Sequence, residues 1–363
     1  MKKGKKHGRV LFVRHAALGD VLLTTPFLRL VQEGAKGAEA DLFSMNAQAM
    51  AGVLGFRELL SMQRHSAEAL AKWDYDRVYW FSYEHDPTLH ILDGYEIATG
   101  LKLKDRTLSW SVDVVRRDRF KQRFAGLKRP LIGFSPTSQH ALRTLSQAKI
   151  QEVVDRVSER LNGSLVVTAQ QRLELTGCHN LSAEVTSIQD LGAVIANCDV
   201  WVTVDSLPFH VAQALAVPTV GIFGCTLPEL RATRPAMLRI VRNENLDCLG
   251  CYHHMPPFSE VLPACARGDL ACLVNLDAEV LVQAIADSLE GRLDLNLQGR
   301  LERYERYKAQ RLAVLPEAYA LGVAQSYRDR VSQLCGKDGR LKRMERAVRQ
   351  FRKTLTAWMR EHG

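Results

Sequence analysis

One stretch of the chain, residues 200–224, restricts the possible folds more than any other part of the sequence. It reads VWVTVDSLPFHVAQALAVPTVGIFG. Val200 to Val204 is typical of a buried strand, Pro208 to Ala216 of a helix with proline in its first turn, and Val220 to Phe223 of a second strand. This order of strand, turn, helix and strand predicts a crossover unit of a parallel sheet.

The polar residues of this stretch follow its first strand. They are Asp205, Ser206 and His210. In an open parallel sheet, ligands bind beyond the carboxyl ends of the strands, where backbone N–H groups at the start of a helix face the crevice. The stretch is therefore predicted to form half of a ligand site.

The length of 363 residues fits two domains of about 100 to 200 residues each. Strands are expected at Arg9 to Val13 and, after the charged stretch 114–128, at Leu131 to Ser135. Each of these strands opens an alternation of strands and helices, so two α/β halves follow one another. We expect a first domain over residues 1–128, a second over 129–295, and a helical tail over 296–363.

The same alternation predicts further elements in each half. In the first half we expect a helix over 21–32, strands over 40–44 and 76–82, and helical patterns around 48–54 and 67–73. In the second half we expect a helix over 147–161, a strand over 164–168 and a helix over 188–197.

The basic residues concentrate in the tail. Residues 300–363 hold 16 Lys and Arg against 7 Asp and Glu, so they carry the whole formal net charge of +9. A basic helical tail suits an anionic surface such as lipid phosphate or nucleic acid, and the alternative is a solvated helix packed on one face. Nucleic acid is the least supported of these partners, because the chain has no pattern of basic and aromatic residues for stacking bases.

No apolar run reaches the roughly 18 to 20 residues that span a bilayer. The opening residues MKKGKKHGRVLFVRH lead directly into an expected strand rather than a signal sequence. These features predict a cytoplasmic protein, with peripheral contact to the inner membrane as a further expectation from the basic tail.

A turn of small residues follows the first expected strand and carries Arg14, Gly19 and Asp20. Small residues let a ligand approach the backbone closely. A carboxylate at Asp20 could take a proton from an incoming hydroxyl. The alternative is that Asp20 caps the helix that follows, because aspartate is favoured at helix N-caps.

The second half opens in a similar way with Ser135, Thr137 and Ser138. Hydroxyl and N–H groups in such a loop can hold phosphate, and Arg143 could reach the same anion with two hydrogen bonds. Another polar cluster follows the strand expected over 76–82 and contains Glu84, His85 and His90. This cluster is either an acceptor-binding loop or an exposed loop.

Four cysteines form the pattern C-x2-C-x13-C-x6-C, at Cys248, Cys251, Cys265 and Cys272. Two pairs of thiolates at this spacing predict a tetrahedral metal site in the loop 248–272. Zinc and iron both accept four thiolates, so the spacing leaves the metal open. With all four positions filled by protein, the metal would be structural rather than catalytic.

Two of these motifs are familiar together. Arg14-His-Ala-Ala-Leu-Gly-Asp20 and the following Val-Leu-Leu-Thr-Thr-Pro resemble the N-terminal motif of the ADP-heptose glycosyltransferases, glycosyltransferase family 9. Asp205-Ser-Leu-Pro-Phe-His210-Val-Ala resembles the second motif of that family, and Gly221 to Thr226 also fits. The full four-cysteine pattern is most similar to the autotransporter heptosyltransferase branch of the family.

The resemblance implies a GT-B architecture, in which two Rossmann-like domains face each other across a cleft. It implies metal-independent, inverting transfer of a heptose or related sugar from an ADP-sugar, with Asp20 as the general base. The donor-binding residues it implies, together with those expected from the residues themselves, are Gly19, Ser135, Thr137, Ser138, Arg143, Asp205, Ser206, Leu207 and His210. The autotransporter branch further implies a structural iron held by the four cysteines.

The acceptor stays open between lipopolysaccharide core, another glycan and a protein hydroxyl, with Arg14, Glu84, His85 and His90 as candidate contacts. Two positions depart from the family pattern, since Leu207 stands where glycine is usual and Arg143 is the nearest cation where lysine is usual. The alternative function is a nucleotide-sugar-binding scaffold that has kept the fold and lost catalysis.

Overall fold

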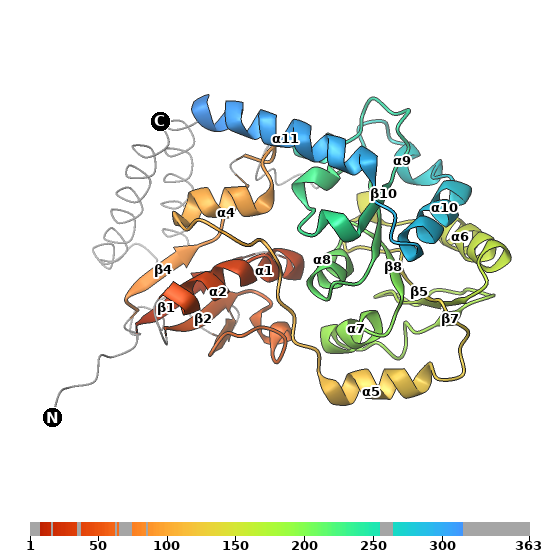
Figure 1. Cartoon of the computed structure of the whole chain (residues 1–363), viewed down its shortest axis with the longest axis horizontal. Helices are drawn as coiled ribbons and strands as arrows, with labels where there is room; N and C mark the ends of the chain where they lie inside the picture. The colour runs from red at the N-terminus through yellow and green to blue at the C-terminus, as the bar shows by residue number, and fades with distance from the viewer. Residues whose placement is uncertain are drawn as a thin grey trace. The chain divides into compact units, whose positions relative to one another are not determined.

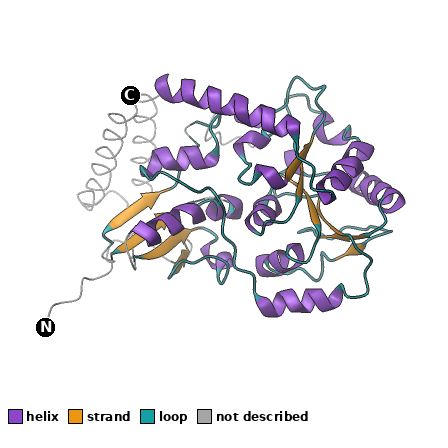
Figure 2. Cartoon of the chain, in the orientation of Figure 1, coloured by secondary structure: helices purple, strands orange, loops and turns teal. Residues whose placement is uncertain are grey.

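The computed structural model describes residues 8–15, 17–34, 38–61, 64, 75–84, 86–254 and 264–314. The chain divides into two compact units, Met1–Arg106 with Arg303–Gly363, and Thr107–Glu302. Each unit contains a parallel sheet with helices packed around it (Figures 1 and 2). Two parallel-sheet α/β domains and a helical C-terminal region, as expected from the sequence, are confirmed.

The first unit is built on a sheet with the strand order β3-β2-β1-β4. Its strands are β1 (Arg9–Val13), β2 (Glu39–Ser44), β3 (Leu59–Ser61) and β4 (Arg77–Trp80). Its described helices before residue 107 are α1 (Leu18–Leu22), α2 (Thr25–Gly34), the short 3-10 helix η1 (Ala47–Met50) and α4 (Ile91–Thr99). The first strand lies inside the sheet, with Val13 opposite Phe43 of β2 and Trp80 of β4.

The core of this unit is aromatic. The ring of Phe12 lies 4.8 Å from that of Phe81, which in turn lies 5.2 Å from Phe27 and from Tyr95. All four side chains are buried. Parallel strands are covered on both faces, and this explains why β1 is an almost continuous apolar run.

The helix expected over 21–32 is two helices, α1 and α2. Pro26 has no N–H and cannot donate to the carbonyl of Leu22, so the helix breaks before it. The hydroxyl of Thr25 donates to Leu22 O at 2.8 Å, and that of Thr24 donates to Val21 O at 2.7 Å. The helical pattern around 48–54 is limited to η1, and the one around 67–73 lies outside the described residues.

The second unit has a six-stranded parallel sheet in the order β10-β9-β8-β5-β6-β7. Its strands are β5 (Leu131–Ser135), β6 (Ser164–Val167), β7 (His179–Asn180), β8 (Val200–Val204), β9 (Thr219–Ile222) and β10 (Leu238–Val241). Its α-helices are α5 (Val114–Arg123), α6 (Gln147–Arg160), α7 (Ile188–Ile195), α8 (Leu207–Ala214), α9 (Ala271–Val274) and α10 (Ala278–Leu289). Its 3-10 helices are η2 (Ala141–Arg143), η3 (Pro228–Leu230), η4 (Pro235–Met237) and η5 (Cys251–His254).

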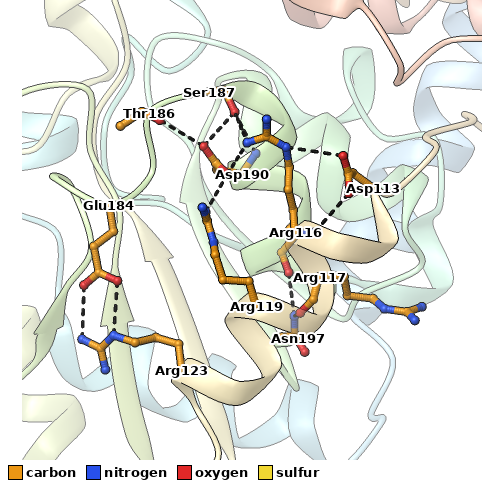
Figure 3. A network of polar contacts seen from close by, with 11 residues as sticks. Asp113, Arg116, Arg117, Arg119, Arg123, Glu184, Thr186, Ser187, Asp190 and Asn197 are labelled. Atoms are coloured by element: carbon orange, nitrogen blue, oxygen red, sulfur yellow. Dashed lines mark hydrogen bonds and ion pairs between the residues drawn. The ribbon is translucent and has the colours of Figure 1, made fainter.

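Helix α5 belongs to the second unit, whereas the sequence analysis placed it before a boundary at residue 128. Figure 3 shows why: Arg116 and Arg119 of α5 reach Asp190 in the first turn of α7, at 2.6 and 2.7 Å. Ser187 and Thr186 donate to the other oxygen of this buried carboxylate. Long-range ion pairs of this kind leave no periodic signal in the sequence.

The helical C-terminal region begins as α11 (Leu295–Val314). Leu297 in its first turn is fully buried against Phe209 and Phe223 of the second unit. Residues from Arg303 onward belong to the first unit, where the Tyr304 hydroxyl donates to Asp93 Oδ2 at 2.5 Å. Among the helices described, none is long and apolar enough to cross a membrane.

Candidate functional site

The first candidate cluster lies where β1 and β4 end. The strand order of the first sheet reverses between these strands, because β2 and β3 both lie on the other side of β1. Ligands of open parallel sheets bind at the carboxyl ends of the strands at such a reversal. Arg14 follows β1 directly, and Glu84 follows β4 by four residues.

Arg14 binds two carboxylates. Its Nη2 atom donates to Asp20 Oδ2, and its Nη1 atom lies beside Glu84 Oε1, both at 2.6 Å. The rings of Tyr83 and Tyr95 lie 4.9 and 5.6 Å from the guanidinium carbon. Arg14 is only 1% exposed, and a buried cation of this kind needs such partners. We call Arg14, Asp20 and Glu84 the acidic cluster, because two carboxylates face one cation.

Asp20 lies in the first turn of α1, but it is not the helix cap. The N-cap is Ala17, which makes no side-chain capping bond. The Asp20 carboxylate binds Arg14 instead, and the Tyr95 hydroxyl donates to its backbone carbonyl at 3.0 Å. The neighbouring residue Gly19 is also in α1 and is buried. The side chain of Asp20 stays 14% exposed, so it is fixed in orientation and still reachable.

Glu84 is ionised at neutral pH. Burial raises the pKa of Glu84, but the charge of Arg14 and the backbone N–H groups of Glu84 and Tyr83 outweigh burial and lower it to about 2. The Ser82 hydroxyl also donates to Glu84 Oε2 at 2.9 Å. Two of the four candidate acceptor contacts, Arg14 and Glu84, are therefore bonded to each other.

The other two acceptor candidates lie elsewhere. His90 is buried and caps α4, because its Nδ1 atom accepts a hydrogen bond from the backbone N–H of Leu92 at 3.0 Å. Its own backbone N–H donates to the Tyr304 hydroxyl at 2.7 Å. His85 lies outside the described residues.

The second candidate cluster lies where β5, β8 and β9 end. The strand order reverses between β5 and β8, because β6 and β7 continue from β5 on one side and β8 to β10 follow on the other. Ser135 is paired with Thr203, and Val204 with Ile222. The residues that follow these strands, including Asp205 and Thr226, therefore share one edge of the sheet with Ser135.

Asp205 is a buried carboxylate with two arginine neighbours. Arg143 Nη1 donates to its Oδ2 atom at 3.2 Å, and Arg231 Nε lies 3.7 Å from the same oxygen. Burial raises the pKa of Asp205, but the charges of Arg143, Arg231 and His210 outweigh burial and lower it to about 2. We call Asp205, Arg143, Arg231 and His210 the cationic cluster, because two guanidinium groups face one carboxylate.

The expected phosphate loop is folded around its own hydroxyl groups. Ser135 is buried and shares a hydrogen bond of 2.7 Å with Thr168. The backbone N–H of Ser138 donates to the Thr144 hydroxyl at 3.0 Å, and Thr137 is half-buried beside it. The Ser135 hydroxyl is therefore already hydrogen-bonded, and Arg143 is the charged group that the loop brings to the sheet edge.

The strip after β8 begins helix α8. Ser206 is the N-cap, but its hydroxyl donates to Val204 O at 3.3 Å and does not cap the helix. Leu207 is the first helical residue and is half-buried, and His210 is buried in the next turn. His210 also lies close enough to Asp205 to lower its pKa.

The cysteine segment is attached to the loop after β9. Gly250 N donates to Gly224 O, and Tyr252 N donates to Cys225 O, both at 2.9 Å. The backbone N–H of Leu227 donates to His253 Nε2 at 3.0 Å. Three hydrogen bonds therefore hold the segment 250–253 beside the cationic cluster.

None of the four predicted metal ligands forms a disulfide. Burial and the three other cysteines of the group raise the pKa of Cys272 to about 11. Burial also raises the pKa of Cys265, but backbone N–H groups of residues 267–270 outweigh it and lower that pKa. In the part of the chain that the structure describes, no three His, Cys, Asp or Glu side chains are grouped as ligands of a metal ion.

Comparison with known families decides the kind of protein. Residues 61–261, more than half of the chain, match the family described as glycosyltransferase family 9 (heptosyltransferase). The chain belongs to glycosyltransferase family 9. The matched range includes Glu84 of the acidic cluster and the whole of the cationic cluster.

Two curated relatives have similar sequences. Lipopolysaccharide heptosyltransferase 3 of Escherichia coli is 26% identical over 136 residues, which is 34% of this chain and 40% of the relative. The same enzyme of strain K12 is 25% identical over 133 residues, or 34% of this chain and 39% of the relative. The chain therefore spans about two fifths of the length of the curated relatives that it matches.

Several solved structures of glycosyltransferases share the fold. A family 9 glycosyltransferase from Veillonella parvula has a TM-score of 0.59 at 18% identity, covering 78% of this chain and 97% of its own. Escherichia coli ADP-heptose lipopolysaccharide heptosyltransferase II has a TM-score of 0.59 at 15% identity, covering 77% and 98%. The iron-containing dodecameric glycosyltransferase TibC of enterotoxigenic Escherichia coli has 0.57 at 13% identity, covering 78% and 76%. The GT-B-like fold is thereby confirmed.

Three residues at or beside the cationic cluster were not predicted from the sequence. They are Arg231, which faces Asp205, and the pair His140 and Tyr252, which flank Arg143. Arg231 lies seven residues beyond Gly224, after the end of a predicted strand, and this position was the available signal. Tyr252 is brought in by the cysteine segment, and no local pattern indicates that contact.

Proposed function

We propose that the protein transfers a heptose or related sugar from an ADP-sugar to a hydroxyl acceptor, with inversion at the anomeric carbon. The proposal is supported by membership of family 9 and by relatives named lipopolysaccharide heptosyltransferase. TibC, which shares the fold, is described as a heptosyltransferase in complex with ADP-D-β-D-heptose. The single observation that carries the proposal is that each sheet has a charged cluster at the point where its strand order reverses, acidic in one unit and cationic in the other.

The cationic cluster is proposed to hold the donor diphosphate. Arg143 and Arg231 provide two guanidinium groups, and Asp205 neutralises one charge and fixes both side chains. The cluster therefore keeps a positive charge for an anion. As the bond from the sugar to the diphosphate breaks, negative charge grows on the phosphate oxygen, and fixed cations stabilise that charge. In this proposal the guanidinium groups neutralise the charge on the leaving diphosphate, so transfer needs no catalytic metal.

Asp20 is proposed as the general base. Its carboxylate takes the proton of the acceptor hydroxyl, the acceptor oxygen forms a bond to the anomeric carbon, and the ADP oxygen leaves with the electron pair of the broken bond. Attack from the face opposite the leaving group inverts the anomeric centre. Arg14 acts as a positioning residue, because it is buried and holds one carboxylate oxygen of Asp20 in place.

The acceptor is proposed to be lipopolysaccharide, another glycan or a protein hydroxyl, with lipopolysaccharide supported by the names of the curated relatives. We also propose that the protein acts in the cytoplasm and that the basic residues of 296–363 contact an anionic membrane surface. The charge of this segment supports that contact, although residues 315–363 lie outside the described part.

We further propose a structural iron, or zinc in its place, at Cys248, Cys251, Cys265 and Cys272. The spacing of the four cysteines supports this proposal, as do the pKa of Cys272, which burial and the other three cysteines raise, and the pKa of Cys265, which backbone N–H groups lower. A bound metal would cross-link the cysteine segment to α9 and so add to folding stability. Elemental analysis of purified protein should give one metal per chain, and Cys251→Ser should lose it; metal-free wild-type protein would refute the site.

A donor screen tests the proposed reaction. Purified protein is incubated with ADP-, UDP- and GDP-sugars and candidate acceptors, and the glycosylated product is detected by mass spectrometry. We expect product with an ADP-sugar, and a product of inverted anomeric configuration. Tight ADP-sugar binding without any product, across lipopolysaccharide, glycan and protein acceptors, would contradict the assignment as a transferase.

A further inference from the structure

One tyrosine of α11 is bound to the start of α4, and both lie within the first unit. The Tyr304 hydroxyl donates to Asp93 Oδ2 at 2.5 Å and accepts a hydrogen bond from the backbone N–H of His90 at 2.7 Å. His90 is the N-cap of α4, and Asp93 lies in its first turn. All three side chains are buried. A single hydroxyl therefore holds both the cap and the first turn of α4.

The Tyr304 hydroxyl stays protonated, and the Asp93 carboxylate stays charged. Burial and the neighbouring Asp93 raise the pKa of Tyr304. Burial raises the pKa of Asp93 as well, but nearby positive charges, chiefly that of Arg106, outweigh burial and lower it. Arg106 binds Asp93 Oδ1, and the tyrosine binds Oδ2. Because hydrogen bonds to a charged group are the stronger ones in proteins, this contact fixes the geometry at the start of α4.

The next residues of α4 reach the acidic cluster. A Cβ atom at Gly94 would lie 2.6 Å from Tyr83 Cβ and 2.9 Å from Tyr83 Cα, so glycine is needed for this close approach. Tyr83 directly precedes Glu84, and its backbone N–H donates to Glu84 Oε2 at 2.9 Å. One residue after Gly94, the Tyr95 hydroxyl donates to Asp20 O at 3.0 Å. The start of α4 therefore contacts the backbone of Asp20 and the residue that precedes Glu84.

We propose that Tyr304 is a positioning residue of the acidic cluster, because its hydroxyl fixes the turn of α4 that orients Asp20 and Glu84. This inference rests on the proposed function, since Asp20 is the proposed base. A base acts only when its oxygen is held in line with the acceptor hydroxyl, and a small displacement lowers the rate. Tyr304 acts through α4 and carries out no step of the reaction itself.

Tyr304→Phe keeps the aromatic ring and removes the hydroxyl. In steady-state kinetics with the donor found by the screen, kcat should fall roughly 10- to 100-fold, as expected when a catalytic group is displaced. The Kd of ADP, measured by isothermal titration calorimetry, should stay at the wild-type value, because the cationic cluster belongs to the second unit.

Tyr307→Phe is the matched control. It is the same substitution on the same helix, but Tyr307 is 40% exposed and its hydroxyl shares a hydrogen bond of 2.6 Å with Thr88, which precedes α4. Its kcat should stay within about twofold of the wild type. Equal losses of kcat in Tyr304→Phe and Tyr307→Phe would overturn the inference.

A double-mutant cycle tests the route through α4. Tyr95→Phe removes the hydroxyl that reaches Asp20. If Tyr304 acts through the same helix, the double variant should lose less kcat than the product of the two single losses. Losses that multiply would overturn the inference, because they would mean that the two hydroxyl groups act independently.

Hydrogen exchange followed by mass spectrometry locates the change. In Tyr304→Phe, the amides of residues 90–95 should exchange faster, and those of β8 in the second unit should keep their wild-type protection. Wild-type kcat in Tyr304→Phe would overturn the inference and leave the proposed function intact. Faster exchange throughout the chain, with kcat and ADP affinity lost together, would also overturn it, because the role would be purely structural. A wild type that transfers no sugar would overturn both the inference and the proposed function.

Discussion

The two sheets share the same strand arrangement but carry clusters of opposite charge at the corresponding strand ends. In both, the first strand lies inside, the strand order reverses beside it, and an ion-paired cluster follows the strand ends. In the first unit one guanidinium, Arg14, faces two carboxylates. In the second, one carboxylate, Asp205, faces two guanidinium groups.

This difference separates two chemical tasks. A carboxylate in excess, such as the partly exposed Asp20, can accept a proton. Guanidinium groups in excess can hold a diphosphate and stabilise the charge on it as it leaves. Within each cluster the central charge is the most buried one, so its role is to position the residues around it.

Asp20→Asn should remove catalysis and leave donor binding unchanged. The amide keeps the size of the side chain and an oxygen for Arg14, but it cannot take a proton. We expect kcat to fall by about 10² to 10⁴, the usual contribution of a general base. Steady-state kinetics with the donor identified by the screen would measure this.

Glu84→Gln is the matched control, because Glu84 binds the same guanidinium at the same distance. It should lower kcat much less than Asp20→Asn does. Equal losses in the two variants would mean that the acidic cluster as a whole, rather than Asp20, carries the activity.

Acid should destabilise both units, and one carboxylate of each cluster contributes to the loss. The pKa values of Glu84 and Asp205 are both lowered to about 2, from ordinary values of 4.5 and 3.8. A lowered pKa stabilises the fold above the ordinary pKa, and that stability is lost as the pH falls from about 4.5 towards 2. The loss is on the order of 3 kcal/mol per group.

Urea unfolding between pH 2 and 6 would measure this loss. Glu84→Gln should flatten the acid dependence of the first unit only, and Asp205→Asn that of the second unit only. An unchanged pH dependence in either variant would show that its carboxylate is not held ionised by the arginine residues.

Arg143→Ala should weaken donor binding more than catalysis. Losing a charged hydrogen-bond donor costs about 1.5 to 3 kcal/mol, so the KM of the donor should rise by roughly 10- to 100-fold. Arg129→Ala is a suitable control, because Arg129 pairs with Asp199 before the amino end of β5. If both variants raised KM equally, the effect would be one of overall charge.

Arg119→Ala should have the smallest effect, about 0.5 kcal/mol on the unfolding of the second unit. Arg119 is 55% exposed, and Arg116 remains to pair with Asp190. Chemical denaturation followed by tryptophan fluorescence would measure the change. A larger effect on the first unit would contradict the assignment of α5 to the second.

Much of the fold follows from local sequence patterns. The strands at Leu131–Ser135 and Val200–Val204 lie where their apolar runs predict them, and polar residues follow them at one sheet edge. The helix break at Pro26 also has a local cause, which the amphipathic pattern over 21–32 concealed. By contrast, the pairing of Arg14 with Glu84 joins residues 70 positions apart, and only the tertiary fold specifies it.

The same reason explains which site residues were found. Asp20 and Asp205 stand within recognisable motifs, so their positions could be predicted. Arg231 and Tyr252 reach the cationic cluster from loops after β9, and their contacts depend on how those loops fold. The ion pair between Arg143 and Asp205 was not predicted from the sequence, and the structure places the two groups 3.2 Å apart.

The most direct test of the division between the two clusters is one calorimetric series, in which ADP is titrated into the wild type, Asp20→Asn and Arg143→Ala. We predict that the first two proteins bind ADP with the same Kd and that Arg143→Ala binds it at least tenfold more weakly. Equal weakening by both substitutions, or undiminished binding by Arg143→Ala, would contradict the account.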